Sequence, residues 1–309
     1  MIRWYPMARA TSLLGGNPII YDLTQIASLT RCVPAYPPIV RDVETIHRSL
    51  RRKNFGSRPT VDLGFEIIHS RTQNTAARYE LIGGNLLQDP DDLTAAPWSA
   101  TNLTVTRPGI ATPDPEGTGN ATRLADSSGA AIGVILQNCG GQPDGVASGK
   151  TGLFSLFLRA DTAHVCSIGI QDNGSQATDL DVDAESVWTR QQVSMTFPAG
   201  SGNFQVMIRA TQLVVAQTGT IDIYRCTLQH IIPQTGTDEQ ILADLEDKFG
   251  SDDWTVALTL DGGLTWRNVL LQQITKAPVA DKWIGHAIDF SLECSDPILT
   301  RPAVLDGRW

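Results

Sequence analysis

Short runs of alternating apolar and polar residues dominate the middle of this sequence, and turn residues separate them at intervals of roughly ten residues. Such period-two alternation predicts strands that bury one face. Strands at this spacing, with Gly and Pro in the connections, are typical of two packed antiparallel sheets, so we expect a jelly-roll β-sandwich. The runs are residues 103–106, 121–125, 131–136, 153–159, 165–171, 188–197 and 204–210.

Two further β-rich segments, residues 82–87 and 221–228, bound this region. A sandwich can place its two ends side by side, and neighbouring ends make insertion into another domain inexpensive. We therefore predict that residues 85–230 form an inserted domain, called the module below. The remaining residues, 1–84 and 231–309, would then fold together as one discontinuous domain, called the frame.

The frame segments predict a second β-sandwich with one helix. Residues 60–69 alternate as a half-buried strand, with Val61, Leu63 and Phe65 on one face. Thr237 and Gln240 have capping-box spacing, and apolar residues then follow a helical period until Gly250. Residues 254–260 and 264–272 predict a hairpin around an Asp-Gly-Gly turn, and residues 284–293 a last strand. The fold class expected is mainly β.

The module resembles the carbohydrate-binding-module-like jelly rolls inserted in tailed-phage structural proteins. The resemblance rests on Asn85-Leu86-Leu87, Pro97-Trp98, Ala121-Thr122-Arg123-Leu124, and residues 155–160 and 219–224. It covers about half of the chain. The resemblance implies a jelly-roll fold that contacts host-surface polysaccharide.

The frame resembles the β-sandwich-plus-helix ring domain of phage tail-tube and distal tail proteins. This resemblance rests on residues 58–65 as a paired central strand and residues 288–297 as the closing strand. It implies a virion protein of a long-tailed phage, made in the host cytoplasm. The protein would assemble as a ring, most simply a hexamer, between tail-tube and tail-hub proteins, and would act by assembly and contact rather than catalysis. The module lies between the two frame halves, whereas related proteins append it at the end.

Two other functions fit the same resemblance. One is a tail-tube or minor tail protein with a decorative module, which differs in its copy number along the tail. The other is a tail-associated glycan hydrolase. Its paired carboxylates are not marked by any motif in this acidic sequence, and the five histidines lack metal-ligand spacing.

Charge is unevenly distributed over the three segments. Residues 1–84 carry eleven Lys and Arg against six Asp and Glu, residues 85–230 seven against fourteen, and residues 231–309 six against thirteen. The opposite signs of the frame halves favour either association of the two halves with each other or contact between copies of the protein. The basic run has one aromatic neighbour and no nucleic-acid motif, so we expect a solvated loop or a subunit interface rather than a phosphate contact. It consists of Arg48, Arg51, Arg52, Lys53 and Arg58.

The five cysteines are widely spaced and contain no Cys-x-x-Cys pair, which predicts buried reduced thiols rather than disulfides or zinc. No apolar run reaches the roughly eighteen residues that a membrane helix needs. Residues 144–151 approach a phosphate-binding loop, but Asp144 replaces its first Gly and a strand pattern follows. Residues 179–183 lack the later EF-hand positions and predict a strand with an acidic outer face.

Four residues of the module are candidates for ligand contact. Jelly rolls of the resembled kind hold a structural calcium ion near the sheet ends, which makes Asp222 the candidate ligand; a solvated strand carboxylate is the alternative. No other cofactor is expected. Trp98, Trp188 and Tyr224 can stack on the apolar face of a sugar, or can equally be core residues.

Overall fold

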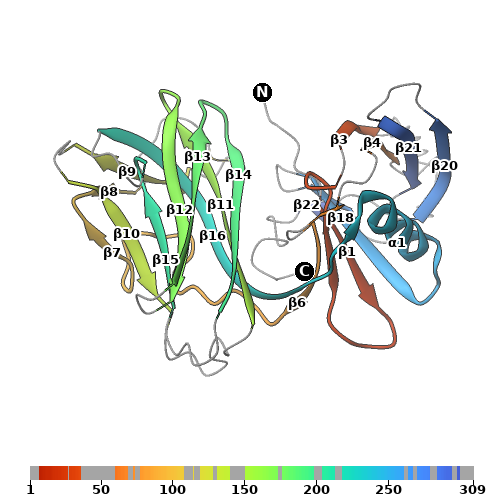
Figure 1. The fold of residues 1–309 in the computed structure, drawn as a ribbon, viewed down its shortest axis with the longest axis horizontal. Helices are drawn as coiled ribbons and strands as arrows, with labels where there is room; N and C mark the ends of the chain where they lie inside the picture. The colour runs from red at the N-terminus through yellow and green to blue at the C-terminus, as the bar shows by residue number, and fades with distance from the viewer. Residues whose placement is uncertain are drawn as a thin grey trace, which may run out of the picture.

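The computed structural model describes residues 7–26, 28–35, 60–68, 72–73, 77–107, 114, 119–127, 131–139, 150–172, 176–197, 204–212, 218–260, 264–266, 270–278, 284–293 and 298–299. This part of the chain is mainly β, with antiparallel sheets and one α-helix, as the sequence predicts (Figure 1). The five basic residues of the predicted subunit interface, Arg48, Arg51, Arg52, Lys53 and Arg58, lie outside the described residues.

The module residues form nine strands and most of a tenth. The nine are β7 (Ser99–Thr101), β8 (Thr104–Thr106), β9 (Thr122–Asp126), β10 (Val134–Asn138), β11 (Thr151–Ala160), β12 (His164–Asp172), β13 (Gln176–Ala184), β14 (Thr189–Thr196) and β15 (Phe204–Arg209). The tenth, β16 (Gly219–Pro233), continues past residue 230 into the frame. The strands β14-β11-β16-β9-β8 are the module part of an eleven-stranded sheet that continues from β16 into the frame. The other sheet has the order β13-β12-β15-β10-β7.

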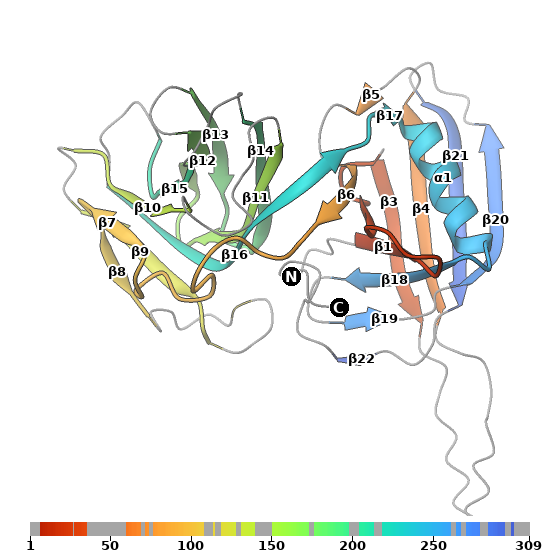
Figure 2. The same ribbon diagram turned by 90° about the horizontal axis from the view of Figure 1, so that it is seen from below.

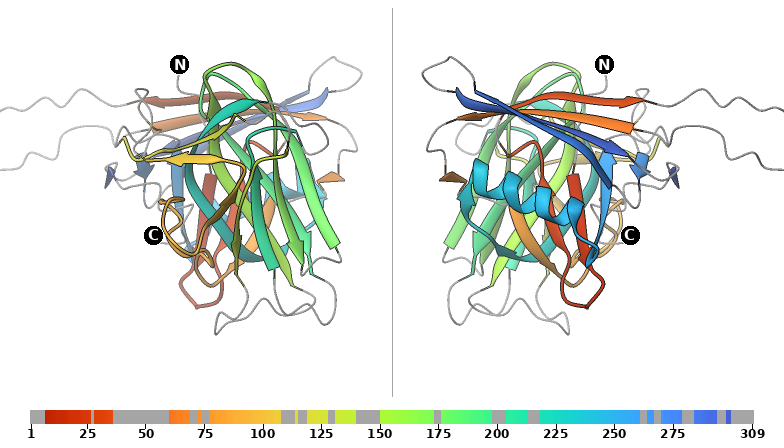
Figure 3. Two further views of the ribbon diagram at one scale, coloured as in Figure 1. Left: turned by 90° about the vertical axis from the view of Figure 1, so that its left-hand side faces the viewer. Right: turned by 90° about the vertical axis from the view of Figure 1, so that its right-hand side faces the viewer.

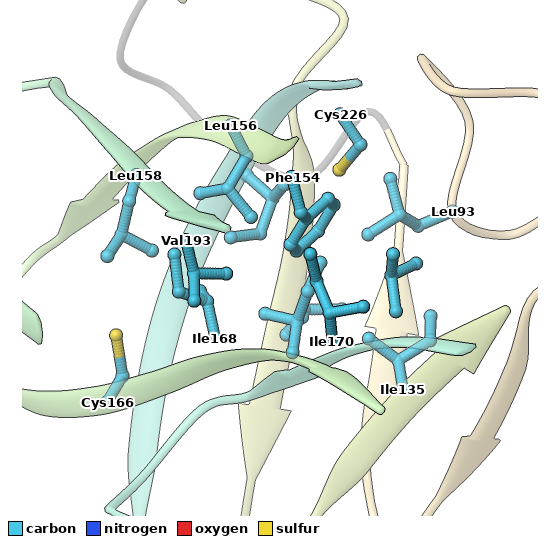
Figure 4. Close-up of a cluster of buried hydrophobic side chains, with 14 of the residues drawn as sticks. Leu93, Ile135, Phe154, Leu156, Leu158, Cys166, Ile168, Ile170, Val193 and Cys226 are labelled. Carbon is cyan, nitrogen blue, oxygen red and sulfur yellow. The ribbon is translucent and has the colours of Figure 1, made fainter. Parts of the chain in front are cut away.

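Alternating side chains of these two sheets meet in one apolar core. Phe154, Leu156 and Leu158 of β11 face Ile168 and Ile170 of β12, and all five are fully buried. Figure 4 shows these side chains pointing toward one another between the sheets. The period of two therefore produces the sandwich that the sequence predicts, because each strand contributes every second residue to the same core.

The frame surrounds a second core. Its elements are β1 (Met7–Ser12), β2 (Ile19–Asp22), β3 (Ser28–Ala35), β4 (Thr60–Ile68), β5 (Thr72–Gln73), β6 (Arg78–Ile82), β17 (Gly236–Thr237), α1 (Asp238–Gly250), β18 (Trp254–Leu260), β19 (Leu264–Trp266), β20 (Leu270–Pro278), β21 (Ile284–Glu293) and β22 (Ile298–Leu299). The sheet β20-β21-β4-β3 packs against β2, β1 and β18, with apolar residues of α1 in the same core (Figures 2 and 3). The frame is thus a sandwich with one helix.

The capping box predicted for the helix is present. The Thr237 side chain accepts a hydrogen bond from the Gln240 backbone, and the Gln240 side chain accepts one from the Thr237 backbone. Ile241, Leu245 and Phe249 then lie buried on the face turned to the sheets. The capping box satisfies free backbone amides at the start of the helix, and burial of the apolar face stabilises the helix against the sheets.

Frame and module share the long strand β16. Its last residues pair with β6, from His230 opposite Ile82 to Pro233 opposite Tyr79. Asn85 extends this contact, since its side chain accepts a hydrogen bond from the Leu228 backbone and donates one to the Cys226 carbonyl. The two ends of the module therefore lie side by side, as predicted.

Six strands are not anticipated by the sequence reasoning: β1, β3, the polar strand β7 and the two-residue strands β5, β17 and β22. The strand predicted at 264–272 is divided, with β19 pairing with β18 and β20 pairing with β21. Among the described residues, no helix combines the length and the apolar character needed to cross a bilayer.

Candidate functional site

Trp98 lies in the module core. Only 8% of its surface is exposed, it packs with Leu87 and Leu93, and its indole nitrogen donates a hydrogen bond to the Asp89 carbonyl at 3.1 Å. A buried ring with its polar atom satisfied presents no face to a sugar. The structure therefore fits the core alternative for Trp98 rather than sugar stacking.

Trp188 and Tyr224 do come together, on the outer face of the β14-β11-β16 sheet. Their ring centroids are 6.4 Å apart in an edge-to-face arrangement, and Tyr224 also packs on Phe157. Tyr224 is 4% exposed, whereas Trp188 is half-buried against this cluster. Because the rings cover one another, Tyr224 fits a packing role, and only part of Trp188 remains accessible.

Asp222 has both carboxylate oxygens engaged by arginine. Oδ1 accepts a bond from Arg123 Nε at 2.8 Å, and Oδ2 accepts one from Arg159 Nη1 at 2.8 Å. Asp161 joins the same network through both guanidinium groups. The hydrogen bond from Arg123 to Asp222 raises the pKa of Arg123. Two fixed positive groups beside a fully buried carboxylate oppose a further cation, so the predicted calcium site does not fit Asp222.

The described part of the chain also contains no group of three or more His, Cys, Asp or Glu arranged to hold a metal ion. Cys139 and Cys166 are buried, and burial raises the pKa of each thiol to about 12. Thiols with such a pKa remain protonated near neutral pH and are poor metal ligands. All four cysteines that the structure describes are free; Cys139, Cys166 and Cys226 are buried as predicted, whereas Cys32 is only partly buried.

The two outer faces of the module sandwich differ in what they contact. Leu153 and Ile231, on the outer face of the β11-β16 sheet, form a small apolar cluster with Met7, Ile20 and Tyr79 of the frame. The other sheet turns its outer face away from this contact, and Figure 1 shows β7, β10 and β15 on the side of the module remote from the frame.

The outer face of the β13-β12-β15-β10-β7 sheet is called the polar face below. It carries a group of polar side chains beside the apolar Val134, Leu136, Val165 and Met207. Cys166, Ile168 and Ile170 of β12 point into the core, so the residues between them point outward, and β13 and β15 alternate in the same way. The side chains that define the face are Asn138, Ser167, Gln171, Asp179, Asp181, Asp183, Gln205 and Arg209.

Hydrogen bonds across the strands hold these side chains in place. Arg209 Nη1 donates to Asp179 Oδ1 at 2.9 Å, and Gln171 Nε2 donates to Gln205 Oε1 at 2.6 Å. Asp181 accepts bonds from Ser167 and from Gln212. Because the side chains are fixed before any ligand arrives, less conformational entropy is lost when they form hydrogen bonds to it.

The polar face has an acidic balance. Asp179 is paired with Arg209, while Asp181 and Asp183 are exposed on the edge strand β13. Behind the sheet, the negative charges of Asp181 and Asp183 add to the effect of burial in raising the pKa of the Cys166 thiol. The face therefore offers many hydrogen-bonding groups and a negative potential.

The sequence reasoning identified only part of this face. It placed residues 179–183 on a strand with an acidic outer face, which β13 confirms, but did not select Gln171, Gln205 or Arg209. The signal that could have identified them is the alternation of residues in β12 and β15, which places these side chains on the face opposite the apolar core residues. Their meeting depends on the cross-strand register, which period alone does not specify.

Comparisons with known proteins give distant likenesses. No protein-family description and no curated protein matches the chain. The enzymatically active domain of bacteriophage CBA120 tailspike protein 4 is similar at 13% identity and TM-score 0.37, over 47% of this chain and 21% of that one. TmCBM61, solved with β-1,4-galactotriose, matches at 12% identity and TM-score 0.33, over 47% of this chain and 97% of that one.

The family 11 carbohydrate-binding module of Clostridium thermocellum, solved with a mixed-linked tetrasaccharide, is also similar. It matches at 13% identity and TM-score 0.31, over 48% of this chain and 95% of that one. This chain spans about a fifth of the tailspike domain. At such scores the likenesses carry no weight for function, which has to be argued from the residues of this chain.

Proposed function

We propose that this protein is a structural component of the tail of a long-tailed phage, a distal tail ring protein whose module contacts glycan on the host surface through the polar face. The proposed location is the tail tip of the virion. The protein would contribute assembly and contact, with no catalytic turnover.

The proposed glycan contact rests on the way in which the module is attached to the frame. On the opposite side, the module is joined to the frame by the shared strand β16, the apolar cluster around Tyr79, and an ion pair between Arg190 and Asp22. A module attached in this way turns its polar face away from the frame. A face directed outward suits a surface that must meet a cell envelope.

The chemistry of the polar face supports a sugar as the ligand. Planar amide, carboxylate and guanidinium groups are donors and acceptors that match hydroxyl groups. Their hydrogen bonds to one another, such as Gln171 to Gln205, leave further donor and acceptor sites on the same groups. A shallow face buries few ligand atoms, so one copy should bind at about millimolar concentration. Several copies on one ring raise the avidity by about a hundredfold or more.

The ring part of the proposal rests on the frame. Its two antiparallel sheets with one packed helix match the architecture expected from the resemblance in residues 58–65 and 288–297. The test is native mass spectrometry of the protein, alone and mixed with tail-tube and tail-hub proteins. A closed ring is expected, and a monomer under both conditions contradicts this part of the proposal.

The glycan part is tested with assembled rings and purified host-surface polysaccharide in a pull-down assay. Gln205→Ala and Arg209→Lys should weaken retention, because the first removes the amide and the second the planar fork of the guanidinium. The matched control is Gln191→Ala on β14, a half-buried glutamine of the opposite sheet. If the control weakens retention as much as the two face variants do, the polar face is not the site.

Catalysis is tested in the same assay. The polysaccharide is recovered after incubation, and its reducing ends and chain length are measured. Unchanged chain length is expected for a contact protein. Shortened chains would replace the contact role with a hydrolase.

A further inference from the structure

Gly169 lies in the middle of β12, between Ser167 and Gln171 on the polar face. Its φ is not in the left-handed region, so its backbone conformation does not demand glycine. Glycine weakens a strand interior, because it adds chain entropy and has no side chain to pack. The reason for glycine at this position must therefore be the space above it.

That space holds the carboxylate of Asp179. A Cβ added to Gly169 would lie 2.1 Å from Asp179 Oδ1 and 3.1 Å from Asp179 Cγ. It would also lie 3.3 Å from Met207 Cε. No real Cβ tolerates the first of these distances, so any other residue at 169 displaces the Asp179 carboxylate.

The same carboxylate oxygen accepts the 2.9 Å hydrogen bond from Arg209 Nη1. Asp179 on β13 and Arg209 on β15 flank β12, so their side chains meet across the strand that carries Gly169. The pair is largely buried but still reaches solvent, since the side chain of Asp179 is 18% exposed and that of Arg209 is 11% exposed. The missing side chain at 169 leaves room for the Asp179 carboxylate of this ion pair.

Resting on the proposed glycan contact, we propose that the Asp179–Arg209 pair reads a vicinal diol of an uncharged sugar, and that Gly169 is the positioning residue of the pair. A carboxylate accepts a hydrogen bond and a guanidinium donates one. Side by side, they match two neighbouring hydroxyls, one as the donor and the other as the acceptor.

The charge of the face selects against acidic sugars. Asp181 and Asp183 lie on the same side of β13 as Asp179, whereas Arg209 is already neutralised by Asp179. A carboxylated or phosphorylated sugar placed over the pair would meet two exposed carboxylates at close range, and like charges repel there. The ligand class is therefore a neutral polysaccharide with intact vicinal diols.

The test uses the assembled full-length protein and three probes: a neutral host-surface polysaccharide, the same polysaccharide after periodate cleavage and borohydride reduction, and polygalacturonate. Periodate breaks the carbon bond between adjacent hydroxyls and so removes the proposed feature. Wild-type protein should retain the first probe and lose the other two. Retention of the cleaved polymer, or stronger retention of polygalacturonate, overturns the inference while leaving glycan contact intact.

The positioning role is tested by a cycle of variants. Gly169→Ala should weaken binding about tenfold or more, comparable to losing one hydrogen bond to a charged group. In an Asp179→Ala background the same substitution should have no further effect, because the displaced group is already gone. An equal loss in both backgrounds means that Gly169 acts on the strand alone, which overturns the positioning role.

Folding is checked by melting temperature, with Gln191→Ala as the control. If Gly169→Ala does not fold, binding is measured instead with the variants Asp179→Asn and Arg209→Lys. Each should weaken binding of the neutral polymer, and unchanged binding in both contradicts the inference. A wild-type protein that retains none of the three probes refutes the proposed glycan contact and the diol proposal together.

Discussion

Arg190 on β14 of the module and Asp22 on β2 of the frame form a buried ion pair, with 2.6 Å between Arg190 Nη1 and Asp22 Oδ2. Their side chains are 5% and 1% exposed. Asp22 also accepts hydrogen bonds from the backbone and hydroxyl of Thr24 through its other oxygen. The carboxylate is therefore satisfied only when module and frame are in contact.

Removing one partner of this pair should strongly destabilise the protein. We expect Arg190→Ala to lower the free energy of unfolding by about 3–5 kcal/mol, because Asp22 is left buried without its counter-charge. Urea denaturation followed by circular dichroism measures the change. The control is Lys276→Ala, which breaks a half-exposed pair with Glu246 and should cost about 0–1 kcal/mol. Similar losses in the two variants would contradict the buried role of the pair.

Asp222 should act as the centre of an arginine network and not as a calcium ligand. Asp222→Asn is expected to lower the melting temperature by several degrees, because Arg123 and Arg159 lose their shared counter-charge. Asp161→Asn is the control, since Asp161 is 52% exposed and should matter little. Calcium chloride or a chelator should leave the wild-type melting temperature unchanged. A clear rise with calcium would restore the metal hypothesis.

Stability should fall at alkaline pH. Burial raises the pKa of the Cys139 and Cys166 thiols from 9.0 to about 12, so the folded state keeps protons that the unfolded state releases. The stability that these two protonated thiols add to the folded state is fully present below about pH 9 and is lost as pH rises toward 12. Melting curves between pH 8 and pH 11 measure the loss. A Cys139→Ala, Cys166→Ala double variant should show a shallower decline, and an equal decline would assign the effect to other groups.

The sequence predicts elements well where one face is strongly apolar. β4 and β21 alternate large apolar residues with polar ones, and both lie within one residue of their predicted bounds. β1 was missed because its core residues, Ala8 and Ala10, are small and give a weak pattern. β3 contains Pro34, which argues against a strand.

The candidate site was less predictable, because residue type does not reveal which face a side chain occupies. An aromatic residue such as Trp98 suits a sugar site and a core equally, and only packing decided between them. The pair of Asp179 and Arg209 joins residues 30 positions apart across three strands. Such a pair needs the register of β12 against both neighbours, which local pattern does not give.

The division into module and frame leads to the last prediction. The main module core contains residues from Leu87 to Leu228 only, and the main frame core draws only on residues before 78 and after 240. We therefore expect residues 85–230 to fold alone, with a cooperative melt and a β-type circular dichroism spectrum. Residue 230 lies within β16. Of the residues after it, Ile231 pairs with Thr151 at the end of β11, whereas Ile232 and Pro233 pair with β6 of the frame, so the cut removes little of the module.

The frame, with residues 85–230 replaced by a short Gly-Ser linker, should fold but be weakened for a specific reason. It loses Arg190 and so leaves Asp22 buried or newly hydrated without its partner. Asp22→Asn should then stabilise the frame alone, while the same substitution destabilises the whole protein by breaking the ion pair. Thermal melting of the four proteins measures this reversal of sign. If Asp22→Asn destabilises both, the carboxylate serves the β2 turn through Thr24 and not the junction between module and frame.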